Sequence, residues 1–155
     1  MNTSFEDVSQ AIAPEEPDYA DASRLGPDAL PHLQRIAENS DPMLASKAAY
    51  LASLIKDDRA VSVLETAAQR DDATVRVAAA AGVANLGSRR RRATKMIACL
   101  LSDADVGVRR RALTSLARTT SADVRPTLET LRREDPDASI RRAASQVLGQ
   151  ASVNS

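Results

Sequence analysis

The chain has 155 residues, 43% of them hydrophobic, and a formal net charge of zero. This length fits one domain, and the single cysteine excludes an intramolecular disulfide. No apolar run reaches the roughly 18 residues of a membrane span. The N-terminus lacks the basic and apolar regions of a signal peptide, so we expect a cytoplasmic protein.

Charge is distributed unevenly along the chain. Residues 1–23 carry a charge of −6 with no lysine or arginine, residues 24–75 carry −2, and residues 76–155 carry +8. The acidic, proline-containing composition of residues 1–23 predicts a disordered tail. Such a tail would either fold back onto the basic half and compete with a ligand, or simply keep the protein soluble.

Eight helices are predicted between residues 24 and 150, and they alternate between two rows. The first row comprises residues 26–38, 58–70, 89–101 and 122–134, and the second comprises residues 40–54, 71–86, 103–117 and 135–149. The second row is anchored by Leu44, Val75, Val108 and Ile140, in steps of 31, 33 and 32 residues. Apolar or small residues recur four and eight positions after each anchor, which places them on one helical face.

The first row has the same period. Its anchors are Leu33, Leu64, Met96 and Leu128, in steps of 31, 32 and 32 residues. Two rows with one period predict four helix–turn–helix repeats, at about 25–56, 57–87, 88–119 and 120–150, with residues 151–155 as a frayed end. Asp41–Pro42 and Asp135–Pro136 are expected to start helices, and Gly87 and Gly149 to end them.

Residues 135–149 read DPDASIRRAASQVLG and resemble the HEAT-like repeat found in phycobilisome lyase subunits and prokaryotic adaptors. The matching residues are Asp135, Ile140, Arg141, Ala143, Ala144, Leu148 and Gly149, with Asp103, Val108, Arg109 and Ala112 in the third repeat and Val75, Arg76, Ala78, Ala79 and Leu86 in the second. The first repeat departs from the pattern, because Ala45 stands where the others have arginine.

The resemblance implies an all-α fold, a right-handed α-solenoid of about four HEAT-like repeats. It also implies a ladder between neighbouring repeats, formed by Arg76, Arg109 and Arg141 with Asp103 and Asp135. The second helix of each repeat would line the concave surface. Fold alone does not specify function.

We expect no enzyme. The only histidine, His32, has no obvious catalytic partner and is expected on the surface, whereas Cys99 is expected to fill the core. The sequence has no Cys/His cluster for a metal and no glycine-rich phosphate loop, so we predict neither a metal nor a cofactor.

A partner-binding surface is expected on the second helices. Positions two and six after each anchor point away from the buried stripe, and those expected to bind a partner are Tyr50, Val77, Arg110, Thr114, Arg142 and Gln146. This strip is apolar at one end and cationic at the other, which favours an acidic, partly hydrophobic protein segment. The alternative is that Tyr50 packs locally and the arginines are merely solvated.

The run Arg89, Arg90, Arg91 and Arg92 is added to the partner-binding set. It opens a first-row helix, where positive charge opposes the helix dipole unless something acidic lies nearby. We therefore predict a noncatalytic, arginine-rich adaptor or scaffold.

Two other functions stay open. The first alternative is nucleic-acid binding through the arginine-rich C-terminal half, although aromatic residues for base stacking are scarce. The second is a lyase-like or enzyme-accessory subunit, which only the resemblance implies. The last repeat is also expected to expose an apolar edge, through which the chain would self-associate.

Overall fold

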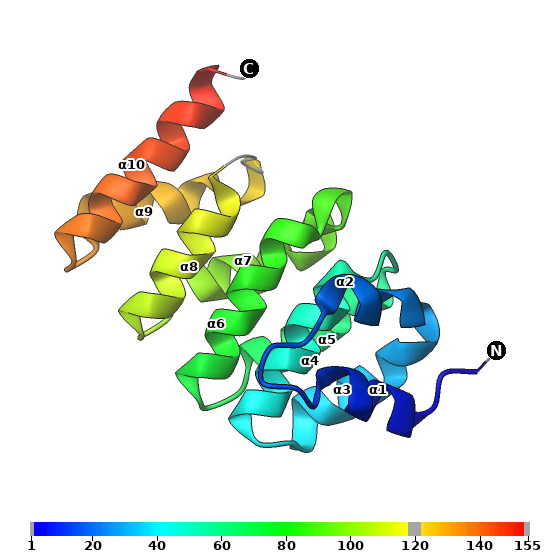
Figure 1. Cartoon of the computed structure of the whole chain (residues 1–155). Coiled ribbons are helices and arrows are strands. Elements are labelled where there is room, and N and C mark those ends of the chain that lie inside the picture. The colour runs from blue at the N-terminus through cyan, green and yellow to red at the C-terminus, as the bar shows by residue number, and fades with distance from the viewer. Residues whose placement is uncertain (1, 118–121, 154–155) are drawn as a thin grey trace.

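The computed structural model describes residues 2–117 and 122–153, and within them all regular structure is helical. Eight helices form four antiparallel pairs (Figure 1). The pairs are α3 (Leu30–Asn39) with α4 (Pro42–Leu54), α5 (Arg59–Ala68) with α6 (Ala73–Gly82), α7 (Thr94–Leu101) with α8 (Val106–Leu116), and α9 (Arg125–Glu134) with α10 (Ala138–Val153). The expected all-α solenoid of four repeats is therefore confirmed.

The repeats stack so that equivalent helices lie side by side. Helices α4, α6, α8 and α10 contact one another in order and form the second-helix layer, while α3, α5, α7 and α9 form the first-helix layer behind it (Figure 1). Short 3-10 turns occur at Ser23–Leu25, Pro27–Ala29, Val83–Asn85, Gly87–Ala93 and Ala122–Val124. Gly87 adopts a positive φ of 57° as the first residue of the turn Gly87–Ala93. It does not end a helix directly, because α6 ends at Gly82 and the turn Val83–Asn85 intervenes.

Each helix of the second layer begins after an aspartate whose side chain accepts hydrogen bonds from backbone N–H groups of the first turn. These capping residues are Asp41, Asp72, Asp105 and Asp137. Asp135 was expected to start the last helix, but the helix begins at Ala138 and Asp137 caps it. Asp135 is thereby free to bind an arginine of the preceding repeat.

Small residues let the second helices approach closely. Ala45, Ala48, Ala49 and Ala52 are all fully buried on α4. A Cβ atom at Gly82 of α6 would lie 2.9 Å from both Ser53 Cβ and Leu64 Cδ2, inside normal contact distance. The spacing of α4, α5 and α6 therefore depends on the absence of a side chain at this position.

Residues 2–23, the described part of the expected tail, are not disordered, contrary to the prediction from their composition. They form α1 (Phe5–Ile12) and α2 (Tyr19–Ala22), and α1 begins with a capping box between Ser4 and Asp7. Val8 and Ile12, four residues apart on one face of α1, are 0% and 1% exposed. Their burial against the first repeat stabilises the segment despite its charge, and it caps the N-terminal end of the stack.

The other end of the stack is polar. Among the described side chains, the large hydrophobic residues that are exposed are Phe5, Met43 and Val106, and none of them belongs to α9 or α10. The expected apolar edge on the last repeat is therefore wrong for these residues. Gly149 does not end a helix either, because α10 continues to Val153; residues 154–155 of the expected frayed end lie outside the described residues.

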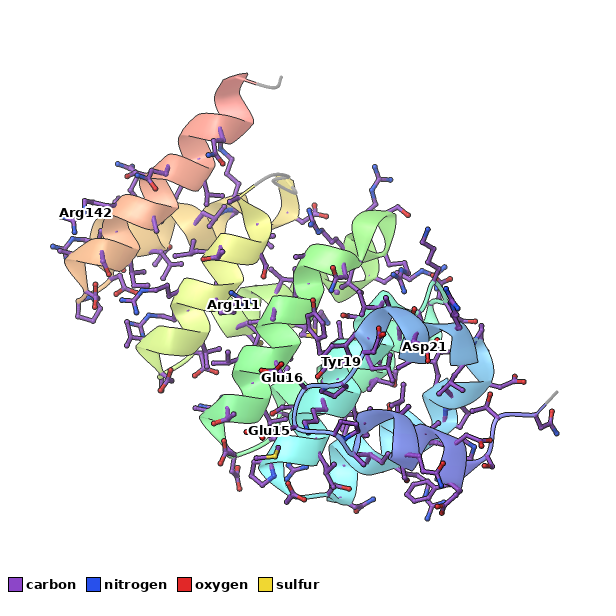
Figure 2. All side chains as sticks on the ribbon, viewed as in Figure 1. Glu15, Glu16, Tyr19, Asp21, Arg111 and Arg142 are labelled. Carbon is purple, nitrogen blue, oxygen red and sulfur yellow. The ribbon has the colours of Figure 1, made fainter. Side chains whose placement is uncertain are left out.

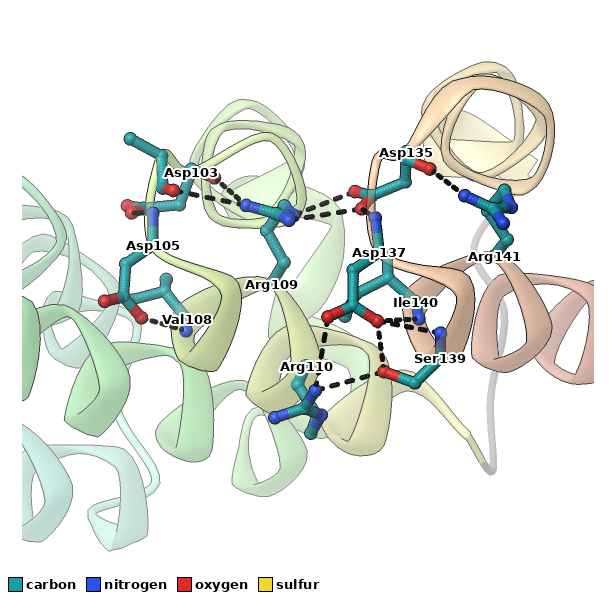
Figure 3. Close-up of polar contacts among 11 residues, drawn as sticks. Asp103, Asp105, Val108, Arg109, Arg110, Asp135, Asp137, Ser139, Ile140 and Arg141 are labelled. Atoms are coloured by element: carbon teal, nitrogen blue, oxygen red, sulfur yellow. Dashed lines mark hydrogen bonds and ion pairs between the residues drawn. The ribbon is translucent and has the colours of Figure 1, made fainter.

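An aspartate–arginine ladder joins the last three repeats, and Figure 3 shows its Arg109–Asp135 rung. Arg76 Nε lies 2.8 Å from Asp103 Oδ2 of the next repeat, and Arg109 Nε lies 2.8 Å from Asp135 Oδ2. Asp103 raises the pKa of the Arg76 guanidinium above its usual value by accepting its hydrogen bond. Arg109 and Asp135 are 10% and 3% exposed, so this pair is removed from solvent.

The ladder changes at both ends of the stack. Arg141 Nη1 donates to the Asp135 carbonyl at 2.6 Å within its own repeat, and no following aspartate is present among the residues described. In the first repeat, where Ala45 replaces the arginine, Arg70, two residues after the end of α5, contacts this repeat instead. Its Nη1 and Nη2 atoms donate to the carbonyls of Ala37 and Ser40 at 2.7 Å and 2.9 Å.

The contrast between two helical glycines gives a first test of the packing. Gly82→Ala should lower the free energy of unfolding by about 1–3 kcal/mol through overpacking, which exceeds the gain of roughly 1 kcal/mol in helix propensity. Gly149→Ala should instead stabilise by up to about 1 kcal/mol, because no atom lies within 4 Å of the new Cβ. Urea unfolding measures both, and a shift in the same direction would contradict the packing argument.

The buried rung of the ladder gives a second test. Arg109→Met should destabilise by roughly 3–5 kcal/mol, because it leaves the Asp135 carboxylate buried without a cation. The double variant Arg109→Met/Asp135→Leu should lose less stability than Arg109→Met, because it leaves no unpaired charge in the buried site. Arg132→Met removes an exposed pair with Glu129 and should cost below about 1 kcal/mol. If Arg109→Met and Arg132→Met lower the free energy of unfolding equally in urea, the buried pair contributes no more to stability than the exposed one.

Candidate functional site

A shallow hollow of about 420 Å³ opens on the second-helix layer between α6 and α8. We call it the α6–α8 hollow. It is lined by Thr74, Val77, Ala78, Ala81, Gly107, Arg110, Arg111 and Thr114. Three of the expected partner-binding residues, Val77, Arg110 and Thr114, therefore meet at one place.

The hollow has an apolar floor and a cationic wall. Val77, Ala78 and Ala81 of α6 are half-buried, whereas Arg110 and Arg111 of α8 are exposed. The Arg110 Nη2 atom donates to Ser139 Oγ at 3.0 Å and lies 3.9 Å from Asp137 Oδ2, so this arginine is partly held by the next repeat (Figure 3).

Arg111 and Arg142 are the open cations of this surface. Both are exposed, and neither side chain has an ion pair or hydrogen bond within the described part of the chain. Arg111 extends from α8 and Arg142 from α10 (Figure 2). Gln146, another expected binding residue, is also exposed on α10. Arg111 lines the hollow, and a free guanidinium group beside an apolar floor suits a carboxylate-bearing ligand.

Arg111 was absent from the expected set, although its register could have revealed it. It stands three residues after the anchor Val108, and the equivalent positions in the other repeats are Lys47, Ala78 and Ala143. Ala78 lines the same hollow as Arg111. The third position after the anchor thus faces outward, as the second and sixth positions do.

The N-terminal segment covers the α4 end of the same layer. We call residues 13–22 the strap. The Tyr19 ring meets the Tyr50 ring edge-on at 4.9 Å between centroids, and Lys47 Nζ donates to the Pro14 carbonyl at 2.6 Å. Burial, with a smaller contribution from Tyr50, raises the pKa of the Tyr19 hydroxyl. Tyr50 therefore packs locally, as the alternative interpretation of the sequence has it.

The strap places negative charge on this face. Glu15, Glu16 and Asp21 are exposed along it (Figure 2). Within the described residues, its carboxylates form no ion pair with Arg111 or Arg142, and Asp21 instead pairs with Arg24 at 3.7 Å. The face is thus acidic over α4 and basic over α8 and α10.

Half of the arginine run is used inside the fold. Arg89 Nη1 donates to the carbonyls of Ile55 and Asp57 at 2.7 Å and 3.0 Å, and Arg90 Nε donates to the Val83 carbonyl at 3.2 Å. The Ile55 and Val83 carbonyls are at the C-terminal caps of α4 and α6, where positive charge is favourable. Arg89 and Arg90 lie in a 3-10 turn before α7 and are directed back to these carbonyls. Burial lowers the pKa of Arg90.

The other two arginines of the run are exposed. Arg92 Nη1 lies 3.2 Å from Asp58 Oδ2, in a pair that is open to solvent. Arg91 is exposed. The run therefore does not act as one cationic patch, and only its second half is available to a partner.

His32 and Cys99 both differ from their expected positions. His32 is half-buried rather than exposed, because its Nε2 lies 3.0 Å from the Thr3 carbonyl and its ring packs against Phe5. Cys99 is exposed rather than buried, since Ile97 and Leu100 supply the inward face of α7.

The described part of the chain contains no group of three or more histidine, cysteine, aspartate or glutamate residues placed to hold a metal ion. No helix in the same residues is long and apolar enough to cross a membrane.

Comparison with known proteins places the chain in a family. No curated protein matches the sequence. A solved structure of the complex of CpcE and CpcF of phycocyanin lyase from Nostoc sp. PCC7120 is similar in fold, with a TM-score of 0.72 and 21% identity over 93% of this chain and 97% of that one. The family model for HEAT repeats matches residues 67–149, more than half of the chain. The chain belongs to the HEAT repeat family.

Proposed function

We propose that the protein is a noncatalytic interaction module, an adaptor or scaffold, that binds an acidic segment of a protein partner on its second-helix layer. The observation that carries this proposal is the exposed guanidinium group of Arg111, which has no partner in the described structure and lines the α6–α8 hollow beside its apolar floor. A second such group, Arg142, lies on the neighbouring helix α10 (Figure 2). Repeat stacks use such extended layers as binding surfaces.

The charge pattern favours a protein partner over nucleic acid. Glu15 and Glu16 lie on the same face as the arginines and would repel a phosphate backbone that extended along it (Figure 2). The two tyrosines of this face pack against each other and offer no open platform for base stacking.

An enzyme-accessory role is the second candidate. It is favoured by the fold that the chain shares with the complex of CpcE and CpcF of phycocyanin lyase. This role predicts that an enzyme subunit co-purifies with the chain. In either case we place the protein in the cytoplasm, in agreement with its single cysteine.

Reversing the two open cations tests the proposal. The variant Arg111→Glu/Arg142→Glu should reduce recovery of the partner from native extract by about tenfold at low salt, equivalent to ~1.4 kcal/mol of binding free energy. The measurement is a nuclease-treated pull-down with quantitative mass spectrometry.

A matched variant controls for net charge. Arg125→Glu/Arg133→Glu makes the same charge change on α9, where both residues are exposed in the first-helix layer. It should leave recovery unchanged. If the bound partner is lost after nuclease treatment, the partner is nucleic acid rather than protein. If both double variants reduce partner recovery equally, the second-helix layer is not the binding surface.

A further inference from the structure

The strap shows how an acidic segment lies on the second-helix layer, because it occupies on α4 the positions that form the open hollow on α6 and α8. Lys47 and Tyr50, three and six residues after the anchor Leu44, contact the strap. The residues in the same register on α6 are Ala78 and Ala81, and on α8 they are Arg111 and Thr114. All four line the α6–α8 hollow.

Arg111 therefore stands in the place of Lys47. The Lys47 ammonium binds the strap through the Pro14 carbonyl at 2.6 Å. An arginine at the equivalent position offers several donors in a planar fork, which suits a carboxylate as well as a carbonyl. In the described structure the Arg111 side chain binds neither a carboxylate nor a carbonyl.

The strap has a chemistry of its own. Residues 13–18 read APEEPD and lie outside any helix, between the end of α1 at Ile12 and the start of α2 at Tyr19. Pro14 and Pro17 restrict the backbone, which lowers the conformational entropy lost when such a segment is held on a surface. Glu15 and Glu16 between them stay exposed.

The strap cannot occupy the hollow in its own molecule without giving up its anchors. Ile12 is 1% exposed in the core at one end, and Tyr19 packs on Tyr50 at the other. The strap therefore leaves the hollow open, although the negative charge of the strap is opposite to that of the arginines that line the hollow.

From this equivalence, we infer that the segment bound by the α6–α8 hollow is short, non-helical, acidic and flanked by prolines, and that it lies there as the strap lies on α4. Arg111 takes the role of Lys47, Val77 and Ala81 form the apolar floor, and Arg142 binds a second carboxylate further along the segment. This inference rests on the proposed function, since it specifies the form of the partner's binding segment.

A synthetic peptide with the sequence of residues 11–20, AIAPEEPDYA, is the probe. Fluorescence anisotropy of the labelled peptide should show saturable binding to the full-length protein, weakened about tenfold by Arg111→Glu and by raised salt. A peptide with Glu15→Lys and Glu16→Lys should bind at least about tenfold more weakly. The protein variant Arg133→Glu, with the same charge change on α9, should bind like the unaltered chain.

Amide chemical shifts in the labelled protein locate the peptide. Changes centred on Val77, Ala81 and Thr114 support the inference. Changes confined to Lys47 and Tyr50 would mean that the peptide only displaces the strap, and would overturn it. Absence of binding, or equal binding to the Arg111→Glu variant, would overturn it as well. If the peptide fails to bind while Arg111→Glu/Arg142→Glu still reduces recovery of the protein partner, the proposed function stands. In that case only the inferred structure of the partner's binding segment is wrong.

Discussion

The whole structure depends on one constraint: a pair of helices is too thin to bury its own apolar stripe, so each pair must be covered by the next. Close approach makes that covering complete. Buried alanines on α4 and the bare Cα of Gly82 bring α4 and α6 together, and the Arg76–Asp103 and Arg109–Asp135 pairs hold the following repeats in register. The outer side of the second-helix layer is left over and becomes the candidate binding surface.

Arginines in this chain serve two purposes that their frequency in the sequence does not separate. Those that reach a neighbouring repeat are consumed by the fold: Arg70 and Arg89 bind helix-end carbonyls, and Arg109 binds Asp135. Those that point outward have no partner in the described part of the chain, as Arg111 and Arg142 show. A buried guanidinium must be fully paired, whereas an exposed one is solvated at little cost. Burial therefore separates the arginines that hold the repeats together from those that are open to solvent.

The acidic segment has both structural and electrostatic consequences. Its apolar residues Val8 and Ile12 close the N-terminal end of the stack, and its carboxylates make the binding layer acidic at that end. The second-helix layer thus carries opposite charges at its two ends, and such a charge pattern favours one orientation of a bound segment over the reverse.

The sequence by itself determined the repeat, because residues spaced by one helical turn on two rows with one period allow only stacked helix pairs. It also placed Val77, Arg110 and Thr114 on the outward face, since the register of a helix follows from its buried anchor. Only the tertiary structure decided that residues 2–23 are ordered, because the burial of Val8, Ile12 and Ala22 outweighs their acidic composition. It likewise decided which arginines are free, and that Tyr50 is covered. These outcomes depend on contacts between residues about 30 positions apart, such as Tyr19 with Tyr50 and Arg89 with Ile55, and local patterns carry no information about such pairs.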